Sequence, residues 1–296
     1  MKFGGTSLGN AHRIRQAANI VLQRQEAFVV CSAMAGITDR LIDISRFWKN
    51  GQTVEIENSL LLLERHFCET AIELFSDTPL FDDVVVHIRE VIQTARDAFL
   101  NEWTASSEKW LLGLGEILTS ALFARFLSLG ACARWLNAYE FMWKNPEGEP
   151  DLQKISQILS GVVDGTNNIY HVTQGFICMN AEGYPDHLQR GGGDYSATLL
   201  GAALNAKAIE IWTDINGVHN NDPRIVPGTR PIREMSYCEA AELAYFGAKI
   251  LHPVCVWPAA RLSIPVYLKY TMDPEAFGTL ISDKAPLKGL RAIAAK

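Results

Sequence analysis

Hydrophobic and polar positions along the chain alternate between two periods. Short apolar, β-branched runs predict strands over residues 26–33, 132–138, 208–215 and 264–270, and another over 173–180 that enters a hairpin at 181–188. Apolar positions at helical spacing predict helices over residues 10–25, 38–51, 194–206 and 237–251, and an almost wholly helical stretch over 53–130. Strands that alternate with helices in this way predict an α/β fold, in which a mostly parallel sheet is covered by helices on both faces.

Five polar or glycine-rich stretches fall at predicted strand ends or helix starts. In chain order they read MKFGGTSLGN, SAMAGITDR, GLGEILTS, QRGGGDYS and WTDINGVHNNDPR. Ligands of open α/β sheets bind beyond the carboxyl ends of the strands. These five stretches are therefore the candidate functional site.

The first stretch places two adjacent glycines, Gly4 and Gly5, between Lys2 and a predicted helix. One interpretation is a tight turn between a strand and a helix, where glycine is conformationally permissive. The other is a phosphate cradle, because glycine lets the main chain approach an anion and the N–H groups at a helix start carry positive partial charge. This stretch alone leaves both interpretations open.

The remaining stretches carry comparable alternatives. Thr38 fits a helix cap, Glu116 fits a helix-dipole or capping group, and Asp214 before Asn-Gly fits turn chemistry. Three consecutive glycines between Arg190 and Asp194 are harder to explain as a linker. Glycine loses much conformational entropy on folding, and a linker has no need of the flanking charges. That stretch predicts an anion-binding turn at a helix start.

Composition narrows the class of protein. The 296 residues carry 27 Lys and Arg against 33 Asp and Glu, a net charge of −6 with no basic run, which argues against a nucleic-acid partner. No apolar stretch is expected to reach the ~20 residues of a membrane span, and no secretory segment is expected after Met1. Six scattered cysteines without a C-x-x-C pair indicate neither a zinc site nor a disulfide framework, so we expect a cytoplasmic protein.

Taken in order and at this spacing, the stretches resemble the catalytic domain of aspartate kinases, within the wider amino acid kinase family. The likeness covers roughly residues 1–283. The matching segments are K-F-G-G-T-S at 2–7, S-A-x-A-G-[IV]-T at 32–38, G-E at 115–116, R-G-G-S-D-[YT]-[ST]-A at 190–197, W-T-D-x-x-G-[IV]-Y-x-x-D-P-R at 212–224 and F-G-A-K-[IV]-L-H-P at 246–253.

The resemblance implies an αβα sandwich over residues 1–285, with an N-terminal aspartate-binding lobe and a C-terminal ATP-binding lobe. It also implies transfer of the γ-phosphoryl group of MgATP to the side-chain carboxylate of L-aspartate, the first step of the aspartate-derived amino acid pathway. A carboxylate with a pKa of about 3.9 is already ionised at neutral pH, so the reaction needs no general base. The implied cofactors are ATP and the Mg²⁺ that it carries. The implied partners are L-aspartate and other copies of the chain in a homo-oligomer. The resemblance implies no nucleic acid, no membrane and no metal held by the protein.

The family pattern also implies residue roles. The catalytic residues would be Lys2, Asp194 and Lys249. The ATP-binding residues would be Gly4, Gly5, Thr6, Ser7, Thr213, Asp214, His219, Arg224, Lys249 and Ile250. The substrate-binding residues would be Ser32, Thr38, Glu116, Arg190, Gly191, Gly192 and Gly193. In this scheme Asp194 orients both lysines, Arg190 binds the α-carboxylate and Glu116 binds the α-ammonium.

The chain departs from the family pattern in four places. Gly193 stands where serine is usual, and His219 stands where tyrosine is usual. Asn220 and Asn221 replace a common small or threonine pair, and only Met1 precedes the lysine. We expect residues 286–296 to be a linker toward a regulatory or fused region. The paired small regulatory domains that usually follow the catalytic domain are missing, so we expect an unregulated short form, a cut fragment or one half of a longer bifunctional chain.

Two other functions remain as alternatives. One is an amino acid kinase that phosphorylates a different small substrate, although Glu116 with Arg190 favours a free amino acid. The other is a nucleotide-binding module without catalysis. Lys2, Asp194 and Lys249 argue against such a module, because it has no physical need for all three.

Overall fold

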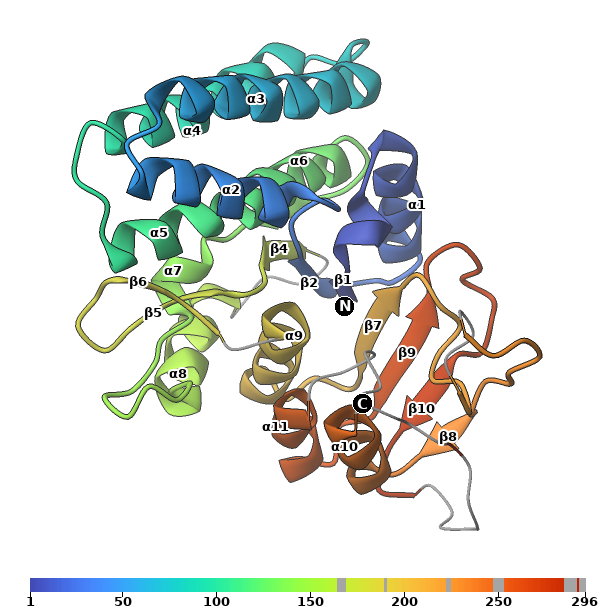
Figure 1. Cartoon of the computed structure of the whole chain (residues 1–296). Helices are drawn as coiled ribbons and strands as arrows, with labels where there is room; N and C mark the ends of the chain where they lie inside the picture. The colour runs from blue at the N-terminus through green and yellow to red at the C-terminus, as the bar shows by residue number, and fades with distance from the viewer. Residues whose placement is uncertain (164–168, 189–190, 222–224, 247–252, 285–291, 293–296) are drawn as a thin grey trace.

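One mixed sheet runs through the computed structural model, which describes residues 1–163, 169–188, 191–221, 225–246, 253–284 and 292. Within these residues the strand order is β3-β4-β2-β1-β7-β9-β10-β8, and a separate hairpin pairs β5 with β6 (Figure 1). The strands are β1 Lys2–Phe3, β2 Ala27–Cys31, β3 Ala133–Trp135, β4 Tyr170–Gln174, β5 Ile177–Met179, β6 Pro185–His187, β7 Ile209–Thr213, β8 Glu234–Met235, β9 Val266–Tyr270 and β10 Thr279–Ile281.

Neighbouring strands from β3 to β9 are all parallel, and only β10 pairs with β9 in the antiparallel sense. The edge strand β8 is parallel to β10. The mostly parallel sheet that the sequence predicts is therefore confirmed. The short strand β1 lies in its middle, between β2 and β7.

Helices cover both faces of this sheet, as predicted. The α1–α6 core packs on one face, with α3 and α4 farthest from the sheet, and the α7–α11 core packs on the other (Figure 1). The helices are η1 Gly5–Leu8, α1 Ala11–Leu22, α2 Ile37–Lys49, α3 Thr53–Phe75, α4 Phe81–Ala98, α5 Ala105–Leu112, α6 Leu114–Ser128, α7 Ala138–Phe141, α8 Leu152–Val163, α9 Gly192–Ala203, α10 Tyr237–Tyr245, η2 Pro253–Val256 and α11 Trp257–Arg261.

Strand alternation decides which side chains enter which core. Phe3 stacks on Trp212 with ring centroids 6.1 Å apart, and both belong to the α1–α6 core. Lys2, one residue earlier, therefore points to the opposite face. Its partners in register, Val30 and Ile211, belong to the α7–α11 core, where α9 lies. The sheet thus places a lysine side chain under the start of α9.

The predicted strand over 173–180 is wrong in its continuity. Strand β4 ends at Gln174, and β5 begins at Ile177 in a different sheet. The break falls at Phe176, which has a positive φ of 70°. Such a backbone conformation cannot continue a strand, so the chain leaves the main sheet there.

One expectation from composition is also wrong. Residues 105–128, which form α5 and α6, are long and apolar enough to cross a bilayer by length and composition. However, 72% of the 18-residue apolar window within this stretch is buried inside the fold, as in the core helix of a globular protein. The stretch is therefore weak evidence for a membrane span.

Candidate active site

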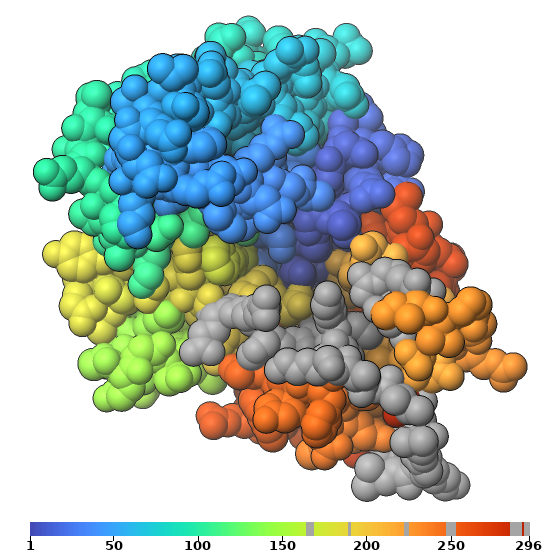
Figure 2. Space-filling view, viewed as in Figure 1, coloured from blue at the N-terminus to red at the C-terminus, as the bar shows by residue number. Residues whose placement is uncertain are grey.

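A buried ion pair lies at the centre of the candidate site. The Lys2 Nζ of β1 lies 2.7 Å from the Asp194 Oδ1 in the first turn of α9, and their side chains are only 11% and 15% exposed. Desolvated charges need a partner, and each of these two groups supplies one for the other. The fold therefore holds a lysine ammonium in a defined place by means of a carboxylate. Figure 2 shows the chain start, in dark blue, where the helical N-terminal part meets the C-terminal part.

The glycine turn before α9 touches this pair. Gly191 is the N-cap of α9 with a φ of 81°, a conformation that favours glycine. A Cβ at Gly193 would lie 2.9 Å from the Ser32 Oγ and 3.1 Å from the Lys2 Cε. Gly193 thus brings the backbone close to both Ser32 and Lys2, for which the family resemblance predicts roles in substrate binding and catalysis. A serine at this position would have to displace one of these two flexible side chains.

A second carboxylate lies near the same lysine. Glu116 is in the first turn of α6 and only 5% exposed. Burial raises the pKa of Glu116 to about 8, although the backbone N–H groups of Ala33 and Glu116 and the charge of Lys2 lower it. Its Oε2 is buried without a hydrogen-bond partner among the described residues. An ionised carboxylate oxygen without a partner can accept a hydrogen bond from a cationic ligand group.

The segment after β2 holds α6 in position. Thr119 on α6 accepts a hydrogen bond from the Met34 N–H at 3.1 Å. A Cβ at Gly115 would lie 2.7 Å from the Ala33 Cβ, so the helix start packs directly on this segment. Thr38 is the second residue of α2, whose N-cap is Gly36 with no side-chain cap bond. The alternative that Thr38 caps this helix is therefore wrong.

The two glycines after β1 have different surroundings. The Gly4 N–H donates to the Trp212 carbonyl at 3.1 Å, so it extends the pairing of β1 with β7. A Cβ at Gly5 would lie 2.5 Å from the Ala33 carbonyl oxygen, so glycine is required here for close backbone packing. The amides of Gly5 and Thr6 open η1, where N–H groups have no acceptor within the helix. These two amides, rather than that of Gly4, are the candidates for a phosphate.

Ser7 forms hydrogen bonds within the protein. It is buried, and its Oγ lies 2.6 Å from the Thr271 Oγ1 and 3.3 Å from the Trp212 carbonyl oxygen. These contacts tie η1 to the end of the sheet formed by β7 and β9. The predicted ATP contact of Ser7 stays a prediction, and its observed role is structural.

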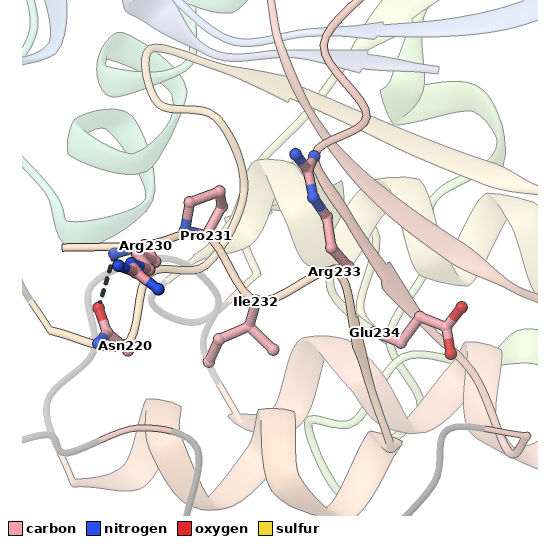
Figure 3. Close-up of a pocket in the computed structure, with 6 residues that line it drawn as sticks. All are labelled: Asn220, Arg230, Pro231, Ile232, Arg233 and Glu234. Atoms are coloured by element: carbon pink, nitrogen blue, oxygen red, sulfur yellow. Dashed lines mark hydrogen bonds between the residues drawn. The ribbon is translucent and has the colours of Figure 1, made fainter.

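The predicted nucleotide residues after β7 lie at the sheet end. The Thr213 Oγ1 donates to the Asp214 Oδ1 at 3.1 Å, and Asp214 is exposed. The His219 Nδ1 lies 2.9 Å from the Thr229 Oγ1. Next to His219, a cavity of about 440 Å³ opens between Asn220 and the segment Arg230, Pro231, Ile232, Arg233 and Glu234. Figure 3 shows Asn220 beside Arg230, whose N–H donates to the Asn220 Oδ1 at 2.8 Å.

Four predicted site residues lie outside the described residues: Arg190, Arg224, Lys249 and Ile250. Of the others, the structure brings Lys2, Asp194, Ser32 and Gly193 together.

Sequence reasoning missed two residues at this site. Phe176 and His187 stack with ring centroids 4.0 Å apart, and Phe176 lies directly beside Gly192. His187 stands three residues before Arg190, and this proximity to the glycine run is the only signal in the sequence.

Comparison with known proteins agrees with this geometry. The sequence model of the "Amino acid kinase family" matches residues 1–270. The chain is 32% identical over 289 residues to "Lysine-sensitive aspartokinase 3" of Escherichia coli (strain K12), covering 96% of the chain and 64% of that relative. It is 33% identical over 301 residues to "Aspartokinase 3, chloroplastic" of Arabidopsis thaliana, covering 95% of the chain and 52% of that relative.

A solved structure gives the same result. E. coli aspartokinase III in complex with aspartate and ADP matches with a TM-score of 0.87 at 32% identity, covering 99% of this chain and 66% of that one. The chain thus spans less than two thirds of these relatives' length. The family match covers nearly all of the sheet and both helical layers. The chain therefore belongs to the amino acid kinase family.

Proposed function

We propose that this chain transfers the γ-phosphoryl group of MgATP to the side-chain carboxylate of L-aspartate. The observation that carries the proposal is the buried Lys2–Asp194 pair beside the unpaired carboxylate oxygen of Glu116. Lys2 offers a fixed cation for a phosphoryl group, and Glu116 offers a carboxyl group that pairs with an ammonium in its ionised form. Similarity to aspartokinases, one of which was crystallised with aspartate and ADP, supports this choice of substrates.

The proposed reaction uses positioning and charge, without a base from the protein. The acceptor carboxylate, with a reference pKa of about 3.9, is ionised at neutral pH and attacks as it is. Lys2 neutralises charge that spreads over the phosphoryl oxygens, and Asp194 fixes the direction of its ammonium. Glu116 binds the α-ammonium of aspartate. By motif, Arg190 and Lys249 would add the α-carboxylate contact and a second cation.

The nucleotide would lie at the carboxyl ends of β1 and β7. The amides of Gly5 and Thr6 at the start of η1 would hold phosphate oxygens, and Asp214 and His219 would line the far side. The turn brings these amides close to the cation of the site, because a Cβ at Gly4 would lie within van der Waals contact of the Lys2 Nζ, at 3.7 Å. Bound Mg²⁺ would supply charge neutralisation at the β- and γ-phosphates. We place the catalytic domain at residues 1–285.

Hydroxamate trapping tests the proposal. Hydroxylamine converts an acyl phosphate to a hydroxamate, so incubation with ATP, Mg²⁺ and L-aspartate should give a coloured ferric complex. D-aspartate, L-glutamate and N-acetyl-L-glutamate are matched control substrates, and release of ADP is followed in parallel. Hydroxamate from another substrate alone would favour a different amino acid kinase. Nucleotide binding without ADP release from any of them would favour a module without catalysis.

A further inference from the structure

Phe176 packs directly against the glycine turn of the candidate site. A Cβ at Gly192 would lie 2.7 Å from the Phe176 Cδ2 and 3.1 Å from its Cα. The Phe176 N–H donates to the Ser196 Oγ at 2.9 Å, and that hydroxyl donates to the Gly192 carbonyl at 2.7 Å. Phe176 therefore contacts the turn through both its ring and its backbone.

The backbone of Phe176 is in an unfavourable conformation. Its φ is 70°, a region that aromatic residues rarely adopt. Such a residue keeps its conformation only where its surroundings determine it. Here the Phe176 carbonyl accepts a hydrogen bond from the Leu188 N–H at 2.7 Å, and the ring stacks on His187 at 4.0 Å with an interplanar angle of 27°. The end of strand β6 therefore holds Phe176 in place.

The His187 ring is itself fixed. Its Nε2 lies 2.6 Å from the Lys109 carbonyl oxygen on α5, and burial lowers the pKa of His187 to about 4. The ring is therefore neutral at neutral pH, and a carbonyl partner requires that Nε2 carry the proton and donate. The His187 backbone N–H also donates to the Asp186 Oδ1 at 2.8 Å.

Two lysines fix the neighbouring carboxylate. The Asp186 oxygens lie 2.6 Å from the Lys109 Nζ and 2.9 Å from the Lys144 Nζ, and the Asp186 and Lys144 side chains are only 13% and 11% exposed. The Lys144 Nζ also donates to the His187 carbonyl at 2.6 Å. The Lys144–Asp186 pair is therefore mostly buried, whereas the Lys109 side chain is 43% exposed, and both bonds are charge-assisted. Strand β6 is therefore tied both to α5 and to the segment after α7.

We propose that the His187–Phe176 stack, anchored by the Lys109–Asp186–Lys144 cluster, is a positioning device that sets the Gly191–Gly193 backbone for the amino acid substrate. His187 and Phe176 are positioning residues and take no part in the chemistry. The inference rests on the proposed function only for the identity of the substrate. Its structural content, that the stack fixes the glycine turn, stands independently of that identity.

Kinetics of His187 variants test the device. In His187→Ala the ring support is lost, so the KM for aspartate should rise about tenfold, near the upper end of what one aromatic pair contributes. The KM for ATP should stay within about twofold, because the stack touches the turn and not η1. His187→Phe keeps the stacked ring and should restore most of the affinity. A wild-type KM for aspartate in His187→Ala would overturn the proposal.

His171 provides a matched control. It is a buried histidine, whereas His187 is half-buried, and its ring likewise stacks on a phenylalanine, Phe28, at 5.7 Å with an interplanar angle of 15°. It lies near the amino end of β4, whereas the site lies beyond the carboxyl ends of the strands. We expect His171→Ala to lower Tm without changing the KM for aspartate. Equal rises of KM in His171→Ala and His187→Ala would show a general loss of packing and overturn the proposal.

Hydrogen exchange separates this inference from the proposed function. If the wild-type protein does not phosphorylate aspartate, the proposed function fails, but the exchange of the amides over residues 191–198 is still measurable. His187→Ala should accelerate exchange there, and His171→Ala should not. A double-mutant cycle that combines His187→Ala with Phe176→Ala should show that the losses of exchange protection caused by the two substitutions are not additive. Unchanged exchange or additive losses would overturn the positioning role.

Discussion

The ammonium of Lys2 is costly to bury, because the residue is only 9% exposed, and the Asp194 carboxylate at 2.7 Å offsets this cost. Buried ion pairs often contribute less to stability than apolar residues of similar volume. Stability alone therefore gives no reason for this pair in the middle of a sheet. A role in ligand binding gives such a reason, because the carboxylate fixes the direction of the ammonium before a ligand binds.

We expect Lys2→Ala to lower kcat by on the order of 10²–10³, because removal of one preorganised charged group from a transition state has an effect of this size. The KM for ATP should change much less, because an interaction made mainly in the transition state contributes little to ground-state binding. Steady-state kinetics with hydroxamate detection measure both constants. Lys269→Ala is the control, because the Lys269 Nζ lies over the Trp212 ring at 5.4 Å, and that ring belongs to the α1–α6 core on the face of the sheet opposite to the Lys2 side chain.

The same substitution leaves Asp194 buried without its cation, so a folding loss must be separated from a catalytic one. The double variant Lys2→Ala/Asp194→Asn carries no orphaned charge and should recover the Tm that Lys2→Ala loses. Its kcat should stay low. A folded Lys2→Ala protein that keeps more than about a third of the wild-type kcat would contradict the assigned role.

If Glu116 binds the α-ammonium as proposed, we expect aspartate binding to depend on pH. Burial raises its pKa to about 8, so the free protein holds this carboxyl protonated at neutral pH. An ammonium pairs with the ionised form, and we expect the KM for aspartate to fall by on the order of tenfold or more between about pH 6.5 and 8.5. Glu116→Gln should raise this KM and remove its pH dependence. A wild-type KM that is flat over this range would exclude Glu116 as the ammonium ligand.

The raised pKa also has a consequence for stability. Between the ordinary carboxyl value of 4.5 and about 8, the folded protein holds a proton at Glu116 that the unfolded chain releases. The unfolded state therefore binds fewer protons, and the free energy of unfolding should decrease as pH rises through this window. Denaturant unfolding of wild type and Glu116→Gln at several pH values measures the difference. If the variant shows the same slope as wild type, another group causes it.

At the scale of elements, the turn between β1 and η1 carries two glycines that can be compared directly. A Cβ at Gly5 would lie 2.5 Å from the Ala33 carbonyl oxygen, whereas one at Gly4 would meet its nearest atoms at 3.7 Å. We expect Gly5→Ala to destabilise the fold by about 1–3 kcal/mol, because backbone must move to admit the methyl group. Gly4→Ala should change the free energy of unfolding by less than about 0.5 kcal/mol. Equal losses in denaturant unfolding would disprove the steric argument.

The pattern of apolar residues predicts strands well where burial alone determines them. Strands β2, β7 and β9 lie inside the predicted runs 26–33, 208–215 and 264–270, because strands buried on both faces read as apolar runs. The same pattern fails at 173–180, where one apolar run holds the end of β4 and the start of β5. The turn between them depends on packing of Phe176 against His187, and nothing local encodes that contact.

At the scale of the whole molecule, the order of strands decides how much of the site is predictable. Motifs at strand ends point to Lys2, Ser32 and Asp194, and the parallel sheet brings them together. Sequence spacing cannot show through-space partners. The Ser7 hydroxyl pairs with Thr271, which is 264 positions away, so a motif position read as a nucleotide contact holds the fold together. Likewise, position 5 must be glycine because the Ala33 carbonyl oxygen, far away in sequence, leaves no space for a Cβ.

Unfolding with ligands tests the whole arrangement. Residues of β2 and of β7 contribute to both the α1–α6 core and the α7–α11 core, so neither core can lose its packing without disturbing the other. We expect one calorimetric transition. L-aspartate and a non-hydrolysable ATP analogue, each at about 100 times its Kd, should each stabilise the fold by about 2.7 kcal/mol. D-aspartate is the matched control and should shift Tm little. Two separate transitions, of which aspartate moves one and the nucleotide analogue the other, would mean that the sheet does not couple the two sides of the site.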